Sequence, residues 1–167
     1  QDEMKSFHEN YTYDLVELSK GKRPLRNKWV FMMKTREDVS SPRYKARIVV
    51  KGFQQKKGVD FDEIFAPVVK MTPFEGIVAS MNLEIEQLDV KTAVLHGELD
   101  EEIHAEAEGV VVKGKENVVC QLRKSLYGLK QAPLQWYKKF ESFMLEYEYH
   151  KTQADHYVFV GIMKVTS

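Results

Sequence analysis

Short apolar runs and polar turns alternate along the first part of the chain. Residues 2–18 predict a helix that leads into a Lys-Gly-Lys-Arg-Pro turn at residues 20–24. An apolar run at residues 29–33 and a partly alternating, β-branched stretch at residues 44–53 flank a Ser-Ser-Pro turn. These two stretches predict a β-hairpin along which basic residues are interleaved with apolar ones.

Later segments predict further short elements. In chain order they are a short helix at residues 73–81, a strand at 83–90, a solvated acidic turn at 98–108, a strand pair at 110–112 and 118–120, and a strand at 157–165. The strand at 83–90 follows from the way its side chains alternate between two faces. Helices and strands in this order indicate an α+β fold.

One longer helix is predicted after a loop at residues 125–131. Pro133 suits its first turn, where the missing N–H has no cost. Apolar side chains then recur at spacings of three and four, at Trp136, Phe140, Phe143, Met144 and Tyr147. This stripe predicts a helix face buried in the core, with Lys138 and Lys139 on the opposite side.

Composition narrows the class of protein. The chain has 167 residues, 43% hydrophobic and 30% charged, which is typical of a globular domain with its own core. Cys120 is its one cysteine, which excludes an internal disulfide and a cysteine-rich zinc site. No apolar run reaches the roughly 18 residues of a membrane span, and the N-terminus is unlike a signal peptide. We therefore expect an intracellular protein, in the cytoplasm or nucleus, with no membrane partner.

The net charge of zero conceals a strong segregation of charge. Residues 1–60 carry a net charge of +6, residues 61–110 a net −10 and residues 111–167 a net +4. The most basic stretch, from Lys20 to Lys57, has 13 basic residues against two acidic ones. Such a stretch suits phosphate binding through counterion release, and equally a solvated basic face. Charge alone leaves both interpretations open.

Asp89 lies at the end of the predicted strand 83–90 and has two interpretations. A carboxylate at the end of a buried strand is costly unless it is paired, which makes Asp89 a candidate cation ligand. Aspartate is also a favoured N-cap, here for a short helix at residues 90–96. On spacing alone, the helix cap is the favoured interpretation.

Five segments together carry a resemblance to one family. They are NKWVF at 27–31, RYKARIVVKGF at 43–53, FDEIFAPVVK at 61–70, QLDVKTA at 87–93 and SLYGLKQAP at 125–133. The chain resembles the reverse transcriptase of Ty1/copia-type retrotransposons, particularly those of plants. The resemblance covers nearly the whole chain and implies one partial domain of a right-hand polymerase. In that domain an antiparallel sheet packs with helices, with basic fingers at about 20–70 and a truncated, partial palm at about 71–167.

This resemblance implies an RNA-directed DNA polymerase that joins a primer 3′-hydroxyl to a nucleotide by two-metal chemistry. It implies an RNA or DNA template–primer and a dNTP as partners, and Mg²⁺ or Mn²⁺ as cofactor in the full-length family member. Asp89 matches the first catalytic aspartate and, with the backbone carbonyl of Val90, would bind the metal. Implied nucleotide-binding residues are Lys34, Lys45, Arg47, Val94, Tyr127, Gly128 and Gln131. Implied contacts to the nucleic-acid backbone are Lys51, Lys56, Lys57 and Lys130.

Several positions depart from the family pattern. The aromatic-x-Asp-Asp motif expected beyond the last strand is not in the sequence, and neither are the thumb and ribonuclease H portions. Val94 replaces an aromatic residue that packs under the nucleotide sugar, and Leu134 replaces a basic residue. Residues 71–81 are a few residues short of the usual helix, and residues 104–110 depart from the expected Glu-Gln-Pro-Glu-Gly run.

Two hypotheses follow for function. The first is a reverse transcriptase domain that is inactive in primer extension as this chain alone, because the second pair of carboxylates is missing. The second is a retrotransposon-derived remnant that binds nucleic acid or a partner protein without catalysis. Self-association through uncovered apolar edges is a further expectation.

Overall fold

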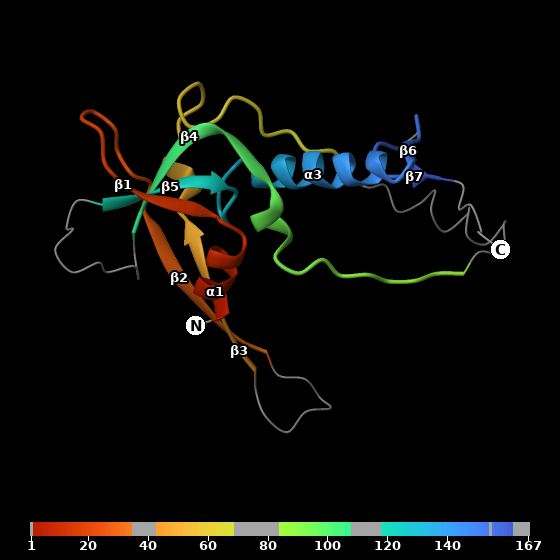
Figure 1. The fold of residues 1–167 in the computed structure, drawn as a ribbon, viewed down its shortest axis with the longest axis horizontal. Helices are drawn as coiled ribbons and strands as arrows, with labels where there is room; N and C mark the ends of the chain where they lie inside the picture. Colours follow the sequence, from red (N-terminus) through yellow and green to blue (C-terminus); the bar gives the residue numbers. More distant parts are fainter. Residues whose placement is uncertain (1, 35–42, 69–83, 108–117, 154, 162–167) are drawn as a thin grey trace.

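Residues 2–34, 43–68, 84–107, 118–153 and 155–161 are described in a computed structural model of the chain (Figure 1). The helices are α1 (Asp2–Glu9) and α3 (Ala132–Glu146), with short 3₁₀ turns η1 (Gly52–Gln54) and η2 (Ala93–His96). The strands are β1 (Tyr13–Glu17), β2 (Asn27–Lys34), β3 (Arg43–Val50), β4 (Glu98–Glu106), β5 (Val118–Lys124), β6 (His150–Lys151) and β7 (Phe159–Val160). The fold is thus a mixture of helices and antiparallel sheets, in agreement with the α+β prediction.

The central sheet has the strand order β1-β5-β4, and both pairs are antiparallel. The predicted helix at residues 2–18 is therefore wrong in its second half, because α1 ends at Glu9 and β1 begins at Tyr13. Tyr11 between them has a φ of 50°, which a continuing helix cannot contain. Tyr13 and Val16 favour a strand, and pairing with β5 satisfies their backbone groups.

The acidic segment forms a strand and is not a solvated turn as predicted. Strand β4 pairs with β5, and the exposed side chains of Glu98, Asp100 and Glu102 alternate with partly buried ones. The strand then enters the core at Ile103. Alternation at a sheet surface lets acidic side chains reach water while the backbone is paired. The predicted strand at 110–112 lies outside the described residues.

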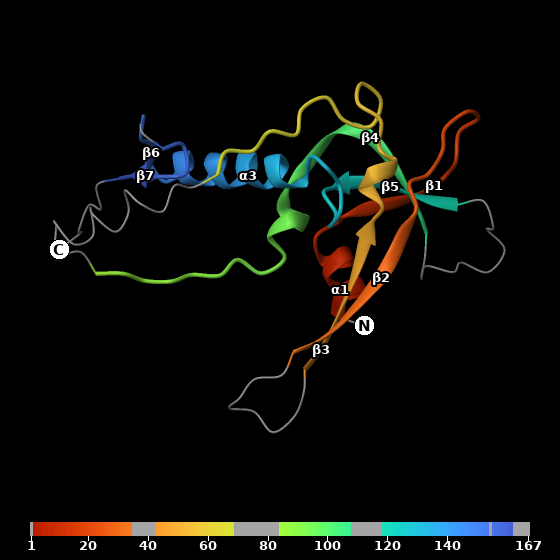
Figure 2. The same ribbon diagram turned by 180° about the vertical axis from the view of Figure 1, so that it is seen from behind.

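The β2–β3 hairpin confirms the prediction from the basic, β-branched pattern. Its register pairs Asn27 with Val50 and Lys34 with Arg43. The hairpin joins the central sheet through Leu25, whose N–H donates to the His104 carbonyl at 2.7 Å. Figures 1 and 2 show the hairpin projecting away from the central sheet, with α1 beside it.

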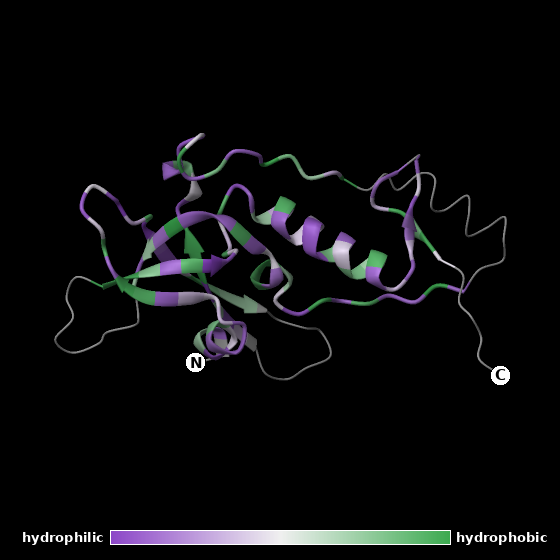
Figure 3. Cartoon of the chain, turned by 45° about the horizontal axis from the view of Figure 1, so that its top comes forward, coloured by the Kyte–Doolittle hydropathy of each residue, from purple (hydrophilic) through white to green (hydrophobic). Residues whose placement is uncertain are grey.

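One continuous core lies between the β1-β5-β4 sheet, the β2–β3 hairpin, α1 and the start of α3. Its buried members are Phe7, Leu25, Ile48, Val50, Leu95, Ile103, Ala105, Cys120, Leu122, Leu126, Leu129 and Ala132. In Figure 3, apolar (green) and polar (purple) residues alternate along the strands and along α3, and apolar residues are also present at the far end of that helix. The core therefore ties the basic hairpin to the loop that precedes α3.

Helix α3 begins at Ala132 with a proline in its first turn, as predicted. The prediction that its aromatic stripe is core is wrong for the C-terminal half of the helix. Phe143 and Tyr147 are 51% and 61% exposed and contact each other, with ring centroids 4.7 Å apart. Helical periodicity identifies an apolar face, but it does not show how far along the helix a partner covers that face.

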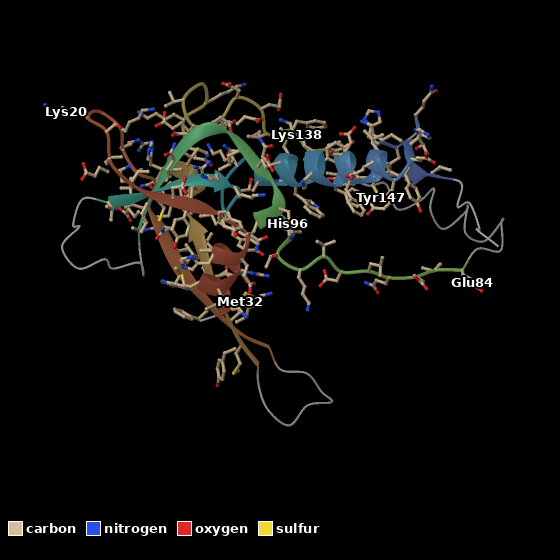
Figure 4. All side chains as sticks on the ribbon, in the orientation of Figure 1. Lys20, Met32, Glu84, His96, Lys138 and Tyr147 are labelled. Atoms are coloured by element: carbon tan, nitrogen blue, oxygen red, sulfur yellow. The ribbon has the colours of Figure 1, made fainter. Side chains whose placement is uncertain are left out.

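Residues 84–90 are extended and pair with no strand of the described chain, so the predicted buried strand is wrong there. Leu88 is 87% exposed, and Figures 2 and 4 show this segment running away from the sheets, with Glu84 at its far end and His96 near the core. Asp89 does not cap a helix either, because Thr92 occupies the N-cap position of η2. A strand is stabilised only when a neighbour completes its hydrogen-bond ladder. The predicted helix at 73–81 lies outside the described residues.

The final predicted strand is present as β7, which pairs with β6 at His150–Val160 and Lys151–Phe159. Phe159 packs edge-on against Phe140 of α3, with ring centroids 5.5 Å apart. The remainder of that prediction, from residue 162 onward, is outside the described part of the chain. Within the described residues, no helix has both the length and the apolarity needed to cross a membrane.

The buried thiol of Cys120 gives a first testable expectation. Burial raises its pKa from 9.0 to about 11, so the reactive thiolate is scarce at pH 8 in the folded protein. Alkylation by iodoacetamide at pH 8 is expected to be about a hundredfold slower or more in the native chain than in guanidinium chloride. Mass spectrometry of timed samples measures both rates, and native and unfolded rates within tenfold of each other would contradict the expectation.

Candidate nucleotide and nucleic-acid site

Two basic residues of β3 lie on one face of the hairpin. Lys45 and Arg47 are two positions apart in a strand and stand opposite Met32 and Val30 of β2. Lys45 is exposed and Arg47 is half-buried. Lys34 is the last residue of β2, two positions beyond Met32. The hairpin thus presents the exposed ammonium group of Lys45 beside the half-buried guanidinium of Arg47.

Tyr127 anchors the guanidinium group of Arg47. The guanidinium carbon lies 4.8 Å from the centre of the Tyr127 ring, within the range of a cation–π interaction. This contact joins β3 to the loop before α3, two segments far apart in the sequence. The ring holds the guanidinium in one orientation. Because the ring carries no net charge, it does not cancel the positive charge of the guanidinium, which can still attract an anion.

A carboxyl group from α1 lies beside these cations. Burial raises the pKa of Glu3, and the positive charges of Arg47 and Lys45 and the backbone of Ile48 only partly offset the rise. The Glu3 carboxyl therefore takes up a proton more readily than an exposed glutamate. The local charge beside Arg47 is set partly by the N-terminal helix, which the basic-stretch pattern did not indicate.

The loop before α3 is held by its leucines and presents the residues between them. Leu126 and Leu129 are buried in the core, while Tyr127 is half-buried and Gly128 is exposed. The N–H of Val50 donates to the Tyr127 carbonyl at 2.8 Å, which continues the edge of β3 into the loop. The arrangement fixes Tyr127 relative to the hairpin.

Two glycines allow the loop to cross the end of β3. A Cβ atom on Gly52 would lie 2.0 Å from the carbonyl oxygen of Gly128. One on Gly128 would lie 2.1 Å from the carbonyl oxygen of Val50, and Gly128 also has a φ of +93°. Any side chain at either position would separate the two segments.

Gln131 and Lys130 fasten the end of the loop. The Gln131 side chain is completely buried and is hydrogen-bonded to Gln55 and to the Asp60 carbonyl, each at 2.9 Å. The Lys130 ammonium lies 4.9 Å from the centre of the Phe61 ring and donates to the Gln55 carbonyl at 3.3 Å. The Gln131 amide therefore makes its hydrogen bonds within the protein, and the Lys130 ammonium group also has internal contacts.

The other lysines implied for the nucleic-acid backbone follow β3. Lys51 is half-buried, and Lys56 and Lys57 are exposed in the turn after η1. The N–H of Lys56 donates to the Asp60 carboxylate at 2.7 Å, which shapes this turn. The exposed ammonium groups of Lys56 and Lys57 thus follow directly after Gln55, which is hydrogen-bonded to the loop.

None of the residues implied for the metal or the nucleotide sugar belongs to a described strand; they are Asp89, Val90 and Val94. Asp89 and Val90 are exposed in the extended segment, whereas Val94 is half-buried against the core at η2. Among the described residues, no three or more His, Cys, Asp or Glu side chains are grouped so that they could hold a metal ion. The described residues therefore supply part of the ligand set that the resemblance implies, Asp89 with the Val90 carbonyl, and do not complete it.

Residues that the sequence patterns did not single out complete the site. Gln55 is 5% exposed and links the turn after η1 to the loop, while Asp60 and Glu3 contribute charge beside the basic residues. Gln54 and Gln55 are adjacent and chemically identical in the sequence. Only burial distinguishes them, so no local signal pointed to Gln55.

Comparison with known proteins places the chain in a family. The family described as reverse transcriptase (RNA-dependent DNA polymerase) matches residues 10–165. The chain therefore belongs to the reverse transcriptase family, in the form found in Ty1/copia-type retrotransposons. This confirms the resemblance seen in the sequence motifs.

Individual relatives are retrotransposon polyproteins. The chain is 63% identical over 159 residues to the retrovirus-related Pol polyprotein from transposon TNT 1-94 of Nicotiana tabacum. It is 38% identical over 156 residues to the retrovirus-related Pol polyprotein from transposon RE1 of Arabidopsis thaliana. These matches cover 93% and 90% of the chain but only 12% and 11% of the polyproteins. No solved structure matches the chain.

Proposed function

We propose that this chain is the part of an RNA-directed DNA polymerase that holds a template–primer and an incoming dNTP. The β2–β3 hairpin and the turns after it, about residues 20–70, serve as the fingers of a right-hand polymerase. Residues from about 71 to 167 serve as part of its palm. The proposal extends the family membership to an activity of the whole polyprotein, of which the chain spans about an eighth of the length.

The contact between Arg47 and Tyr127 carries this proposal. The family motifs at residues 43–53 and 125–133 are far apart in the sequence, and the guanidinium stacks on the ring at 4.8 Å. An oriented guanidinium suits a phosphate, and a neighbouring aromatic ring suits a base. The two features together at one place suit the binding of a nucleotide.

The remaining residues take roles that follow from their positions. Lys34, Lys45 and Arg47 bind the triphosphate, Tyr127 and Gly128 lie against the nucleotide and template, and Val94 lies under the sugar. Lys51, Lys56, Lys57 and Lys130 contact the nucleic-acid backbone, and the buried Gln131 holds the loop in place. Asp89, with the Val90 carbonyl, is the carboxylate that we assign to catalysis with Mg²⁺ or Mn²⁺.

The experiment that tests this proposal is equilibrium binding of the chain to a labelled RNA-template, DNA-primer duplex with a single-stranded template overhang. Fluorescence anisotropy at several salt concentrations is expected to give a log–log slope that is steeply negative. The double substitution Lys45→Ala and Arg47→Ala is expected to weaken binding about tenfold and to reduce the slope by about 2.

A charge-matched control separates this site from general charge. Lys138→Ala with Lys139→Ala removes the same two positive charges from the exposed face of α3. This variant is expected to bind within about twofold of the unsubstituted chain. If affinity does not change with salt, or if both double variants lose affinity equally, the proposed site is wrong.

A further inference from the structure

A chain of side-chain amides connects the fingers segment to the start of α3. Gln55 Oε1 accepts the N–H of Lys130 at 2.8 Å, and Gln55 Nε2 donates to Gln131 Oε1 at 2.9 Å. Gln131 Nε2 then donates to the Asp60 carbonyl at 2.9 Å. The chain of hydrogen bonds begins on the loop, crosses two glutamines and ends on the turn after η1.

The direction of every hydrogen bond in this chain is determined by its two ends. The Lys130 N–H can only donate, and the Asp60 carbonyl can only accept. Each amide in between must therefore present its oxygen toward Lys130 and its nitrogen toward Asp60. Reversing either amide would place two acceptors or two donors against each other.

The surroundings of the amides make such a mismatch costly. Gln131 is completely buried and Gln55 is 5% exposed, so water cannot readily replace a lost partner. Several charged groups surround the pair, and they are Lys130, Glu101 (3.4 Å from Gln131 Nε2), Asp60, Lys56 and Arg23 (3.9 Å from Asp60). The pair lies in a buried polar network in which each polar atom of the two amides is used.

We propose that Gln55 is a positioning residue for nucleic-acid binding: it holds the Tyr127–Lys130 loop against β3. This inference rests on the proposed function. Gln55 accepts a hydrogen bond from the Lys130 N–H, and the same loop carries the Tyr127 ring that orients Arg47. Gln55 thus acts on the bound phosphates through the loop and does not contact them.

The same segments also meet at a close crossing, beside the hydrogen bonds from the Val50 N–H to the Tyr127 carbonyl and from the Lys130 ammonium to the Gln55 carbonyl. Gly128 and Gly52 meet backbone to backbone without side chains that could interlock. A buried donor–acceptor chain supplies the directional restraint that such a contact lacks. Without it, the Tyr127–Lys130 loop is expected to shift relative to β3 and to hold the Arg47 guanidinium less firmly, although the buried Leu126 and Leu129 keep the loop on the core.

The sharpest test is Gln55→Glu, measured with the same RNA–DNA duplex at pH 8.0 and pH 5.0. The introduced carboxyl group, when ionised, has no donor for Gln131 Oε1, whereas its protonated form accepts from Lys130 and donates to Gln131. Burial favours the protonated form, so the restored bond is present at low pH and lost as pH rises. The ratio of variant to unsubstituted Kd is expected to be about 10 at pH 8.0 and near 1 at pH 5.0.

Gln54→Glu is the matched control, because it makes the same change one residue away. Gln54 Oε1 accepts the N–H of Arg26 at 3.2 Å, which a carboxylate also does. Its Kd ratio is expected to stay near 1 at both pH values, so any effect of pH that is common to both variants cancels. Thermal unfolding of both variants at both pH values shows whether each is folded.

The outcomes separate this inference from the proposed function. If the unsubstituted chain does not bind the duplex, both fail. If it binds and the Lys45/Arg47 variant is weakened, but Gln55→Glu binds normally at pH 8.0, only the positioning role is wrong. A Gln55→Glu defect that is equal at both pH values indicates a general loss of structure and overturns the positioning role as well. Should Gln55→Glu not fold at pH 8.0, Gln131→Glu, which also needs a proton to donate to Asp60, is expected to show the same pH-dependent recovery of binding.

Discussion

Replacing Gly128 with alanine is expected to lower the free energy of unfolding by about 4 kcal/mol or more. The added Cβ would lie 2.1 Å from the Val50 carbonyl oxygen and 2.8 Å from Cγ1 of Val49. The obstructing oxygen belongs to the backbone of a core strand, so it cannot move aside as a flexible side chain would. Urea unfolding monitored by tryptophan fluorescence measures the change.

Gly21→Ala provides the matched control for this substitution. Gly21 also has a positive φ, +84°, but a Cβ there meets nothing within 4 Å. Its cost is therefore the conformational cost alone, about 1 kcal/mol. Equal effects of the two substitutions would show that the close crossing of the loop and β3 does not contribute to stability. A loss of duplex binding by any folded Gly128→Ala chain is also expected, because Tyr127 moves with the loop.

Asp89→Asn is expected to reduce primer extension by about a thousandfold or more in a Pol polyprotein that carries this segment. The substitution preserves the shape of the side chain and removes its negative charge. Carboxylate oxygens are the ligands that Mg²⁺ prefers, and a neutral amide replaces them poorly. Asp89 is exposed in the described structure, so the substitution has little folding cost to confuse the result. Extension of a labelled primer on an RNA template measures the loss.

Glu86→Gln is the control for Asp89→Asn, since it removes a carboxylate from the same exposed segment. We expect its primer extension to remain within about threefold of the unsubstituted enzyme, which corresponds to the small effect of a surface substitution. Duplex binding of the Asp89→Asn chain is expected to be nearly unchanged, because Asp89 lies outside the basic hairpin. Comparable extension by the Asp89→Asn and unsubstituted enzymes would exclude Asp89 from catalysis.

Local patterns predicted the elements that depend on nearby residues. The hairpin was evident from two apolar, β-branched runs, and its register is consistent with the burial of Ile48 and Val50 on one face. The beginning of α3 was evident from Pro133 and the helical spacing that follows it. In each case the stabilising contacts are close in sequence, or the burial is strong enough to leave a periodic pattern.

Strand β5 was predicted in part, at residues 118–120, but two strands that pair with it were predicted wrongly. Strands β1 and β4 both owe their conformation to β5, which lies between them in the sheet. The acidic composition of β4 favours a solvated turn, and pairing with β5 outweighs that preference. Residues 84–90 have a strand pattern, but they pair with no strand among the described residues. Alternation shows where a strand is possible, but not whether a partner is present.

Some residues of the candidate site were likewise predictable from the sequence, and others were not. Motif resemblance pointed to Arg47 and Tyr127, and the structure adds that their side chains stack. Gln55 left no trace in the sequence because its importance comes from Gln131, which is 76 residues away. Polar residues at a buried junction have no periodicity and no composition signal, so only the tertiary structure reveals them.

The sequence by itself determined the family, the basic character of the hairpin and the chemical types of residue available to bind a nucleotide. These properties are carried by residue identity and short spacing, which do not depend on how distant segments meet. Tertiary structure alone decided that the loop crosses β3 at Gly52 and Gly128, and that two buried amides lock it there. A buried hydrogen bond or a backbone crossing is defined by two segments together, and neither segment encodes it alone.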